Sequence, residues 1–172
     1  MTAQYRAPVL LDREHDIAGF RSSSPEQTAW LRDFARGSHA GDHTKVQVVT
    51  QADSPAVVAY YAWRMAQLSV ADAPRRASAG GGRYPVPVAL LARLAVDERH
   101  EVRGLGSSLL RHVLKRTVEA AQAIGCRALL VHCETPQARD WYVHHVPAFE
   151  PSPSDPMHLI LLTKDLRRAV SG

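Results

Sequence analysis

The segment Arg93–Leu110 (RLAVDERHEVRGLGSSLL) constrains the fold of this chain more than any other. An apolar run ends at Val96, a short polar turn follows, and Arg-Gly-Leu-Gly then leads into two serines and a helical pattern. Glycine lets the main chain approach a ligand closely. The first amides of a helix lack intrahelical acceptors and carry the positive end of the helix dipole. The segment therefore predicts a phosphate-binding helix start, to which Arg103 adds a full positive charge.

Two familiar phosphate motifs do not fit this segment. The dinucleotide fingerprint requires a third glycine, and Leu109 occupies that position. A P-loop requires Gly-Lys-Ser/Thr, which does not follow here. The pattern thus indicates a phosphate-bearing ligand of another class.

Hydrophobic periodicity outlines the rest of the chain, whose 172 residues suggest a single domain spanning residues 1–172. Ser24 is the expected N-cap of the first helix, and Gly37 is its expected end. We expect an α/β fold with a mixed central sheet and helices on both faces. The predicted strands are 45–50, 56–65, 88–96, 127–133 and 157–163, and the predicted helices are 24–37, 107–124 and 136–145.

The stretch 71–87 interrupts this pattern and is rich in glycine, proline and alanine. We expect a long loop here, because these residues break both helices and strands. Long loops inside compact domains are more often functional than inert. Arg75, Arg76 and Arg83 on this stretch are available to an anion.

The overall charge of +4 and the pI near 9.4 favour a polyanionic partner, such as a phosphorylated cofactor or an RNA. No apolar run approaches the roughly 18 residues that a membrane span needs. The N-terminal residues also lack the apolar core of a signal peptide, so we expect a cytoplasmic protein.

Several reactive residue types carry no recognisable motif. Cys126 and Cys133 lie in or beside a predicted strand and are expected to be reduced core residues. His132 is expected in a buried strand. His144 and His145 should end a helix, and no His-Glu-x-x-His motif accompanies them, so no metal site is expected.

The segment Arg93–Leu110 resembles the acetyl-CoA-binding core of the GNAT acetyltransferases. The resemblance implies the GNAT fold with acetyl-CoA as cofactor. It further implies that the strand residues Leu94, Ala95 and Val96 pair with the pantetheine arm. The turn around the pyrophosphate would consist of Val102, Arg103, Gly104, Leu105, Gly106, Ser107 and Ser108. Glu101 and Val102 depart from the family pattern, which more often has Gln or Arg and then Gly at these positions.

A closer resemblance, to the GNAT toxins of type II toxin–antitoxin modules, covers most of residues 15–166. It implies an enzyme that acetylates the α-amino group of aminoacyl-tRNA and blocks translation. It also implies a ribbon-helix-helix antitoxin as partner, and a homodimer. The matching segments include Thr28-Ala29-Trp30-Leu31, Ala59-Tyr60-Tyr61-Ala62, Arg93-Leu94-Ala95-Val96-Asp97, Ala138-Arg139-Asp140-Trp141-Tyr142 and Phe149-Glu150-Pro151-Ser152-Pro153.

The same resemblance places the catalytic tyrosine of these toxins at Tyr142. A phenol is protonated at neutral pH and can supply the proton that a leaving thiolate needs. The insertion Val146-Pro147-Ala148 replaces a single glycine of the relatives. The candidates for tRNA phosphate contacts are Arg75, Arg76, Arg83 and Arg93, although Arg93 could instead serve structure.

Two alternatives stay open at this point. The protein could be a GNAT enzyme that acetylates a small amine or a protein N-terminus. It could also be a non-catalytic acetyl-CoA-binding or co-repressor module, an option that the departures at Glu101 and Val102 leave open. Tight cofactor binding without turnover on charged tRNA would favour the second alternative.

Overall fold

A computed structural model describes residues 4–171, and its contacts divide the chain into two compact units. Unit 1 contains the chain up to Arg64 together with Ala92–His112, and unit 2 contains Met65–Leu91 and the chain from Val113 onward. Three elements contribute residues to both units: β3 (Val57–Leu68), β4 (Val86–Val96) and α4 (Leu105–Ala123). The hydrogen-bonded strand order is β1-β2-β3-β4-β5-β7-β6.

The sheet is mixed, which confirms the sequence-based expectation. Strands β4 and β5 (Ala128–His132) pair in parallel, with Val88 opposite Ala128. The pairs β1–β2, β2–β3, β5–β7 and β6–β7 are antiparallel. A parallel pair needs a crossover connection, and α4 supplies it between β4 and β5.

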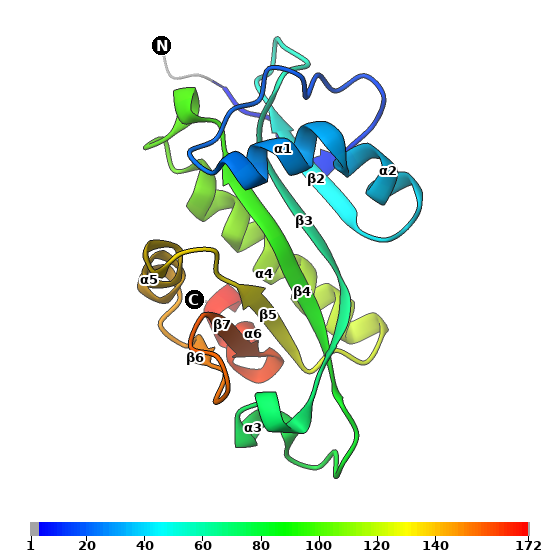
Figure 1. Ribbon diagram of the computed structural model, residues 1–172, viewed down its shortest axis with the longest axis vertical. Helices are drawn as coiled ribbons and strands as arrows, with labels where there is room; N and C mark the ends of the chain where they lie inside the picture. The colour runs from blue at the N-terminus through cyan, green and yellow to red at the C-terminus, as the bar shows by residue number, and fades with distance from the viewer. Residues whose placement is uncertain (1–3, 172) are drawn as a thin grey trace. The chain divides into compact units, whose positions relative to one another are not determined.

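Unit 1 begins with β1 (Val9–Leu10), α1 (Pro25–Asp33), α2 (Ala35–Ala40) and β2 (Lys45–Thr50). Ser24 caps α1 as expected, since its hydroxyl accepts a hydrogen bond from the Gln27 amide at 3.1 Å. The prediction of one helix over 24–37 is wrong, because Phe34 leaves the helical region with φ −122° and separates α1 from α2. In Figure 1, α1 lies across β2 and β3.

Consecutive tyrosines on β3 show that helices cover both faces of the strands in unit 1. Side chains alternate between faces along a strand. The Tyr60 hydroxyl donates to the Gln27 carbonyl of α1 at 2.6 Å, whereas the Tyr61 hydroxyl lies 2.9 Å from Nδ1 of His112 on α4. Tyr60 also belongs to a buried apolar cluster with Leu31 and Ala95.

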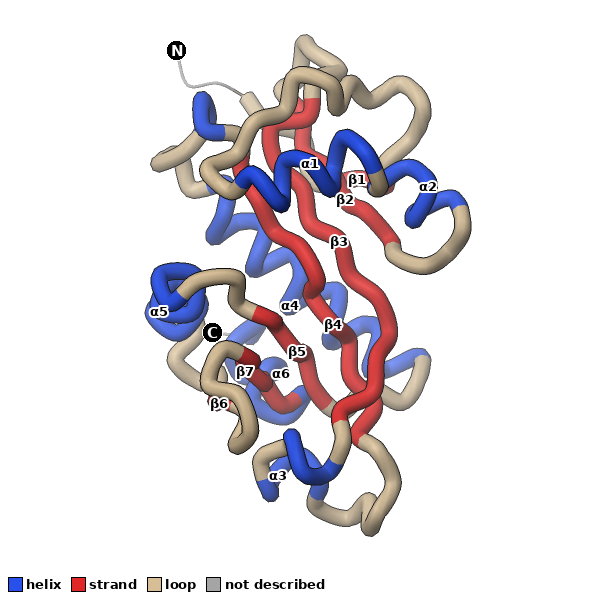
Figure 2. Tube along the Cα trace, viewed as in Figure 1, coloured by secondary structure: helices blue, strands red, loops and turns tan. Residues whose placement is uncertain are grey.

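Unit 2 contains the remaining strands and helices, shown as tubes in Figure 2. Strand β7 pairs along β5 with Leu130 opposite Ile160, and both strands are almost entirely buried, as their apolar runs predict. Thr135 caps α5 by accepting from the Ala138 amide at 3.1 Å. The further elements of unit 2 are α3 (Arg75–Ser78), α5 (Pro136–His145), β6 (Glu150–Pro151), β7 (His158–Leu162) and α6 (Thr163–Ser171).

The stretch 71–87 is partly helical rather than one long loop. A 3₁₀ turn, η1 (Val70–Asp72), starts at Ser69, and Pro74 precedes α3. The irregular parts are residues 73–74 and 79–85, and in the second of these Gly80 and Gly82 have positive φ angles of 83° and 62°. In the part of the chain that the structure describes, no helix is long and apolar enough to span a membrane.

Candidate cofactor and catalytic residues

The carboxyl end of β4 offers main-chain groups to a ligand. The described part of the parallel ladder between β4 and β5 ends at Leu91, and β4 continues for a further five residues to Val96. Ala95 is buried in the unit 1 core, whereas Leu94 and Val96 are half-buried. An extended ligand can pair with such a strand as an added strand would. Leu94, Ala95 and Val96 lie on this extension of β4.

Asp97 fixes the turn that follows β4. Its side chain is 1% exposed and accepts hydrogen bonds from the main-chain amides of Arg21 and Arg99 at 3.0 and 2.9 Å. The Arg99 guanidinium adds two contacts at 2.9 and 2.8 Å. Burial by itself would raise the pKa of Asp97, but these hydrogen bonds outweigh it and lower the pKa to about 2. The turn is therefore held by an ionised carboxylate.

The start of α4 has the geometry of an anion site. Gly104 adopts φ +80°, and no atom lies within 4 Å of the position that a Cβ would occupy. Ser108 makes the first intrahelical hydrogen bond, its amide donating to the Gly104 carbonyl at 3.0 Å. The preceding amides of residues 105–107 are therefore the free donors of the helix start. These donors, with the positive end of the 19-residue helix, suit a diphosphate.

Arg103 is held by two residues that sequence reasoning did not find. Its Nη1 donates to the Tyr5 hydroxyl at 3.1 Å, and this hydroxyl lies 2.8 Å from Nδ1 of His100. Burial lowers the pKa of His100, so its ring is neutral at pH 7 and Nδ1 can accept the Tyr5 proton. No local motif connects Tyr5 to a residue 98 positions away.

Val102 adopts a conformation that a β-branched residue rarely takes. Its φ is +54°, in the left-handed region, and its side chain is fully exposed. The side chain therefore gains no burial that would offset the strain. Glu101 is exposed beside it.

We expect Val102→Gly to raise the free energy of unfolding by about 1 kcal/mol, because glycine removes the left-handed penalty of a side chain. Chemical denaturation of the purified protein measures this change. Val102→Ala is the matched control: it keeps a Cβ and should recover a smaller part of the gain. If Val102→Gly were no more stable than wild type, Val102 would be unstrained.

Tyr142 is buried in α5 with 7% of its surface exposed. Its ring makes edge-to-face contacts with Trp141 and Phe149 at centroid distances of 5.0 and 6.0 Å. Burial, with a smaller contribution from Cys133, raises the pKa of Tyr142 well above its ordinary value near 10. The group is therefore a phenol at any physiological pH. Among the described residues, none hydrogen-bonds its hydroxyl, which leaves that proton available.

The segment after α5 supports Tyr142 from one side. Val146 is buried, and its carbonyl accepts from the Phe149 amide at 3.1 Å, which turns Phe149 onto the tyrosine ring.

The expectation that His132 is buried is wrong. It ends β5 as an exposed residue and stacks on His158 at 3.9 Å. Both cysteines are free thiols: Cys126 is buried, and Cys133 is half-buried.

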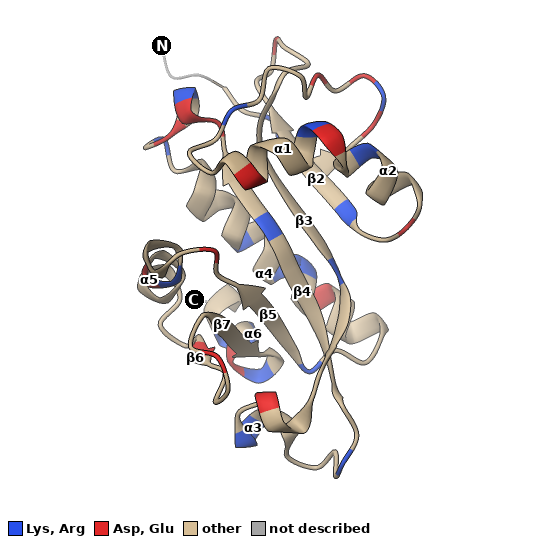
Figure 3. Ribbon diagram, in the orientation of Figure 1, with Lys and Arg blue, Asp and Glu red and all other residues tan. Residues whose placement is uncertain are grey.

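The four arginines proposed for phosphate contacts have different environments. Arg93, in unit 1, pairs with Glu26 at 2.6 Å and lies over the Trp30 ring at 5.3 Å. The structure thus gives Arg93 a packing role. Arg75, Arg76 and Arg83 lie in unit 2 and are exposed, although Arg76 forms ion pairs with Glu150 and Asp165. Figure 3 shows basic segments on α3 and α6.

A mixed α/β fold, a strand that extends beyond its parallel partner and a glycine turn that opens a helix together describe an α/β protein with a site for a phosphate-bearing ligand. The sequence model of the acetyltransferase (GNAT) family matches residues 13–145. The chain belongs to this family.

Comparison with known proteins narrows the class further. The chain is 43% identical over 166 residues to a tRNA-acetylating toxin of Mycobacterium tuberculosis, covering 96% of this chain and 97% of that protein. The solved structure of AtaT complexed with acetyl-methionyl-tRNAfMet matches with a TM-score of 0.84 at 20% identity, covering 94% of this chain and 97% of that one. AtaT bound to acetyl-CoA and the C-terminus of the antitoxin AtaR matches with a TM-score of 0.80 at 18% identity, covering 96% and 98%.

Proposed function

We propose that this protein is a toxin that transfers the acetyl group of acetyl-CoA to the α-amino group of an aminoacyl-tRNA. The observation that carries the proposal is the 43% identity to a tRNA-acetylating toxin over nearly the whole length of both chains. The exposed arginines of unit 2 are consistent with an RNA substrate. Because the family match spans residues of both units, we infer that they form one acetyltransferase domain.

The residues at the start of α4 fit the cofactor. The free amides of residues 105–107 and the Arg103 guanidinium would bind its diphosphate, and Gly104 keeps the approach open. The main chain of Leu94–Val96 would pair with the pantetheine arm. Acetyl-CoA supplies an acetyl group activated as a thioester.

Tyr142 would donate its hydroxyl proton to the thiolate that leaves when the C–S bond breaks, and it would regain a proton from water. The α-amine forms the new C–N bond and releases one N–H proton to water, so the reaction consumes no proton overall. The Tyr142 hydroxyl holds a proton at neutral pH and is not committed to another described residue. The amine needs little activation, since an α-amino group titrates near 8. No strong general base is therefore required.

The direct test combines purified protein, radiolabelled acetyl-CoA and a full set of individually charged tRNAs. We expect label on the amino acid of one or more charged tRNAs and none on the uncharged ones. Spermidine and an unstructured peptide with a free N-terminus serve as competing acceptors. Label on either of these, with none on any charged tRNA, would contradict the proposal.

The raised pKa of Tyr142 predicts a pH profile without an alkaline decline. A proton donor loses activity only above its pKa, and burial moves that pKa above 10. We expect kcat/KM to rise as the α-amine deprotonates and then to stay level up to pH 9.5. A 3′-amide analogue of the charged tRNA survives these conditions. A decline between pH 8 and 9.5 would show that a more acidic group donates the proton.

We further propose a homodimer that a ribbon-helix-helix antitoxin neutralises, in the cytoplasm where charged tRNA is present. The structure of AtaT with its antitoxin supports a protein partner of this kind. Light scattering of the purified chain, alone and after co-expression with the product of a neighbouring ribbon-helix-helix gene, tests both points.

A further inference from the structure

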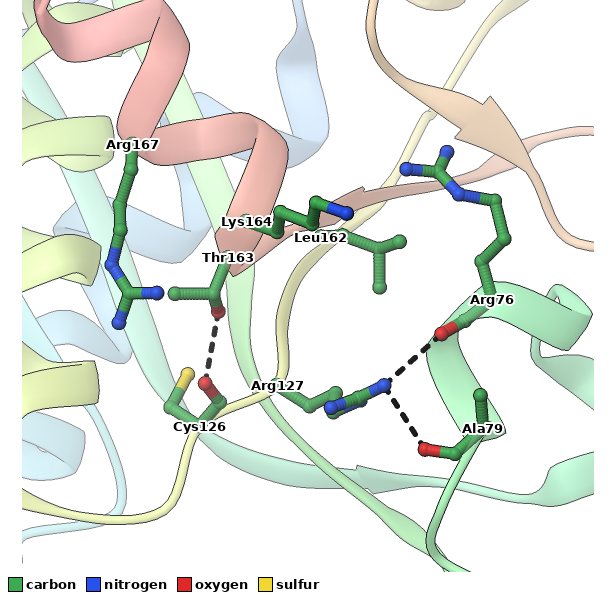
Figure 4. A pocket seen from close by; sticks show the side chains of 8 residues that line it. All are labelled: Arg76, Ala79, Cys126, Arg127, Leu162, Thr163, Lys164 and Arg167. Carbon is green, nitrogen blue, oxygen red and sulfur yellow. Dashed lines mark hydrogen bonds between the residues drawn. The ribbon is translucent and has the colours of Figure 1, made fainter.

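Unit 2 contains a cationic pocket whose lining residues all belong to that unit. Its volume is about 460 Å³, within the range of about 300–1,000 Å³ that ligand pockets occupy. Four cations, Arg76, Arg127, Lys164 and Arg167, line it together with Cys126 and Thr163. Figure 4 shows that they come from α3, from the two residues before β5 and from α6. We call this the α3–α6 pocket.

Local hydrogen bonds fix the walls of the α3–α6 pocket. Arg127 donates from Nε to the Ala77 carbonyl at 2.8 Å and from Nη2 to the Ala79 carbonyl at 3.0 Å, which holds its guanidinium against α3. The Thr163 hydroxyl donates to the Cys126 carbonyl at 2.9 Å and fixes the first residue of α6. The Arg127 guanidinium and the beginning of α6 are therefore preorganised in the pocket wall.

The pocket carries an excess of positive charge. Arg76 is neutralised by Glu150 and Asp165. Arg127 contacts carbonyl groups and no carboxylate, and within residues 4–171 neither Lys164 nor Arg167 forms an ion pair. Four cations face two carboxylates, which leaves a net charge of +2. An anion with about two negative charges is the complementary ligand.

An exposed aromatic residue beside the pocket indicates which anion it takes. A second hollow of about 650 Å³ shares Ala79 and Arg127 with the α3–α6 pocket and is lined by the glycine turn and Tyr84. Tyr84 is 81% exposed although its ring is largely apolar. An aromatic face next to a cationic pocket is the combination that proteins use to stack a base of single-stranded nucleic acid and neutralise its backbone.

We propose that the α3–α6 pocket binds backbone phosphates of the RNA substrate and that Tyr84 stacks on an adjacent base. The identity of the RNA as tRNA rests on the proposed function, whereas RNA binding by the pocket does not depend on it. Lys164 and Arg167 supply the uncompensated charge, and Arg127 separates the phosphate and base positions. The sequence predicts phosphate contacts for Arg75, Arg76, Arg83 and Arg93, whereas Arg127, Lys164 and Arg167 become candidates only through the fold.

The test measures binding of fluorescently labelled, uncharged tRNA by anisotropy at several salt concentrations. For Lys164→Ala/Arg167→Ala we expect affinity about tenfold weaker at 0.1 M salt. The slope of log K against log [salt] should be shallower by about 1.5, since each lost phosphate contact removes about 0.7–0.9. For Tyr84→Ala we expect a similar loss of affinity with an unchanged slope, because stacking releases no counterions.

Lys115→Ala/Arg116→Ala is the matched control, because it removes the same charge from exposed positions of α4 in unit 2. Equal weakening by both double variants would overturn the proposal, since it would show a general field effect. Unchanged tRNA affinity in Lys164→Ala/Arg167→Ala would overturn it as well. If that variant instead loses affinity only for a ten-residue polyglutamate peptide, the pocket receives an acidic protein segment and not RNA.

A small acceptor separates this inference from the proposed function. Acetylation of an amino acid methyl ester, which carries no phosphate, should be unchanged in Lys164→Ala/Arg167→Ala. If tRNA binding depends on the pocket but wild type acetylates no charged tRNA, the pocket inference stands and the proposed function fails. If wild type acetylates charged tRNA and the pocket substitutions leave tRNA affinity unchanged, the proposed function stands and the pocket inference fails.

Discussion

Replacing Tyr142 with phenylalanine is expected to lower kcat for charged tRNA by about 10²- to 10⁴-fold, the usual contribution of a positioned proton donor. The substitution removes one hydroxyl group and leaves the packing against Trp141 and Phe149 in place. In the described residues that hydroxyl bonds no protein group, so its loss should not destabilise the fold. The loss of activity would therefore report on chemistry alone. Single-turnover acetylation with the variant and wild type measures it.

Two controls make this result specific. The affinity for acetyl-CoA, measured by calorimetry, should be the same in Tyr142→Phe and wild type, because Tyr142 is not assigned to cofactor binding. Tyr61→Phe removes another hydroxyl, one that bonds His112, and should keep near wild-type kcat. If the activity of Tyr142→Phe stayed within fivefold of wild type, another group or water would be the proton donor.

The second large effect is expected on stability, from Asp97→Asn. An amide at this position retains one acceptor oxygen but loses the charge that Arg99 neutralises, and it leaves a main-chain amide of Arg21 or Arg99 without its partner. A buried donor that loses its partner costs about 1–3 kcal/mol, so we expect the free energy of unfolding to fall by about 2–3 kcal/mol. Urea denaturation at pH 7 measures this loss.

The pH dependence of the same variant provides an independent check. The folded state lowers the pKa of Asp97 from its ordinary value of about 3.9 to about 2, so ionised Asp97 stabilises the fold above pH 4. That contribution disappears as the pH falls toward 2. The difference in unfolding free energy between wild type and Asp97→Asn should therefore narrow by about 2 kcal/mol between pH 5 and pH 2. Asp53→Asn, at an exposed position, should show no such narrowing.

Local patterns in the sequence predict the central elements of the fold well. Strand β2 has the predicted bounds, α5 starts at its predicted proline, and the glycine turn opens α4. These features depend on capping, periodicity and backbone conformation, which act over a few residues. The sequence does not predict helix α6, because its nine residues, TKDLRRAVS, are mostly polar and bury only Thr163 and Leu166, although their pattern is amphipathic.

Residues brought together by the chain topology could not be predicted in this way. Tyr5 reaches Arg103 across 98 positions, and Arg127 meets α3 across about 50. In the sequence, the residues adjacent to Arg127, Lys164 and Arg167 do not distinguish these three from ordinary surface cations. The division of roles among the proposed arginines, with Arg93 packed on Trp30 and Arg76 in ion pairs, is likewise a tertiary property.

The donors at the start of α4 belong to the main chain, and every amino acid except proline provides the same donor. Mutation can therefore change the side chains around this turn without removing its main-chain donors, as long as Gly104 keeps its left-handed backbone. The side chains of Glu101 and Val102 can therefore depart from the family pattern while the main-chain donors stay the same. Structural neighbours likewise keep this architecture although only about one residue in five is identical.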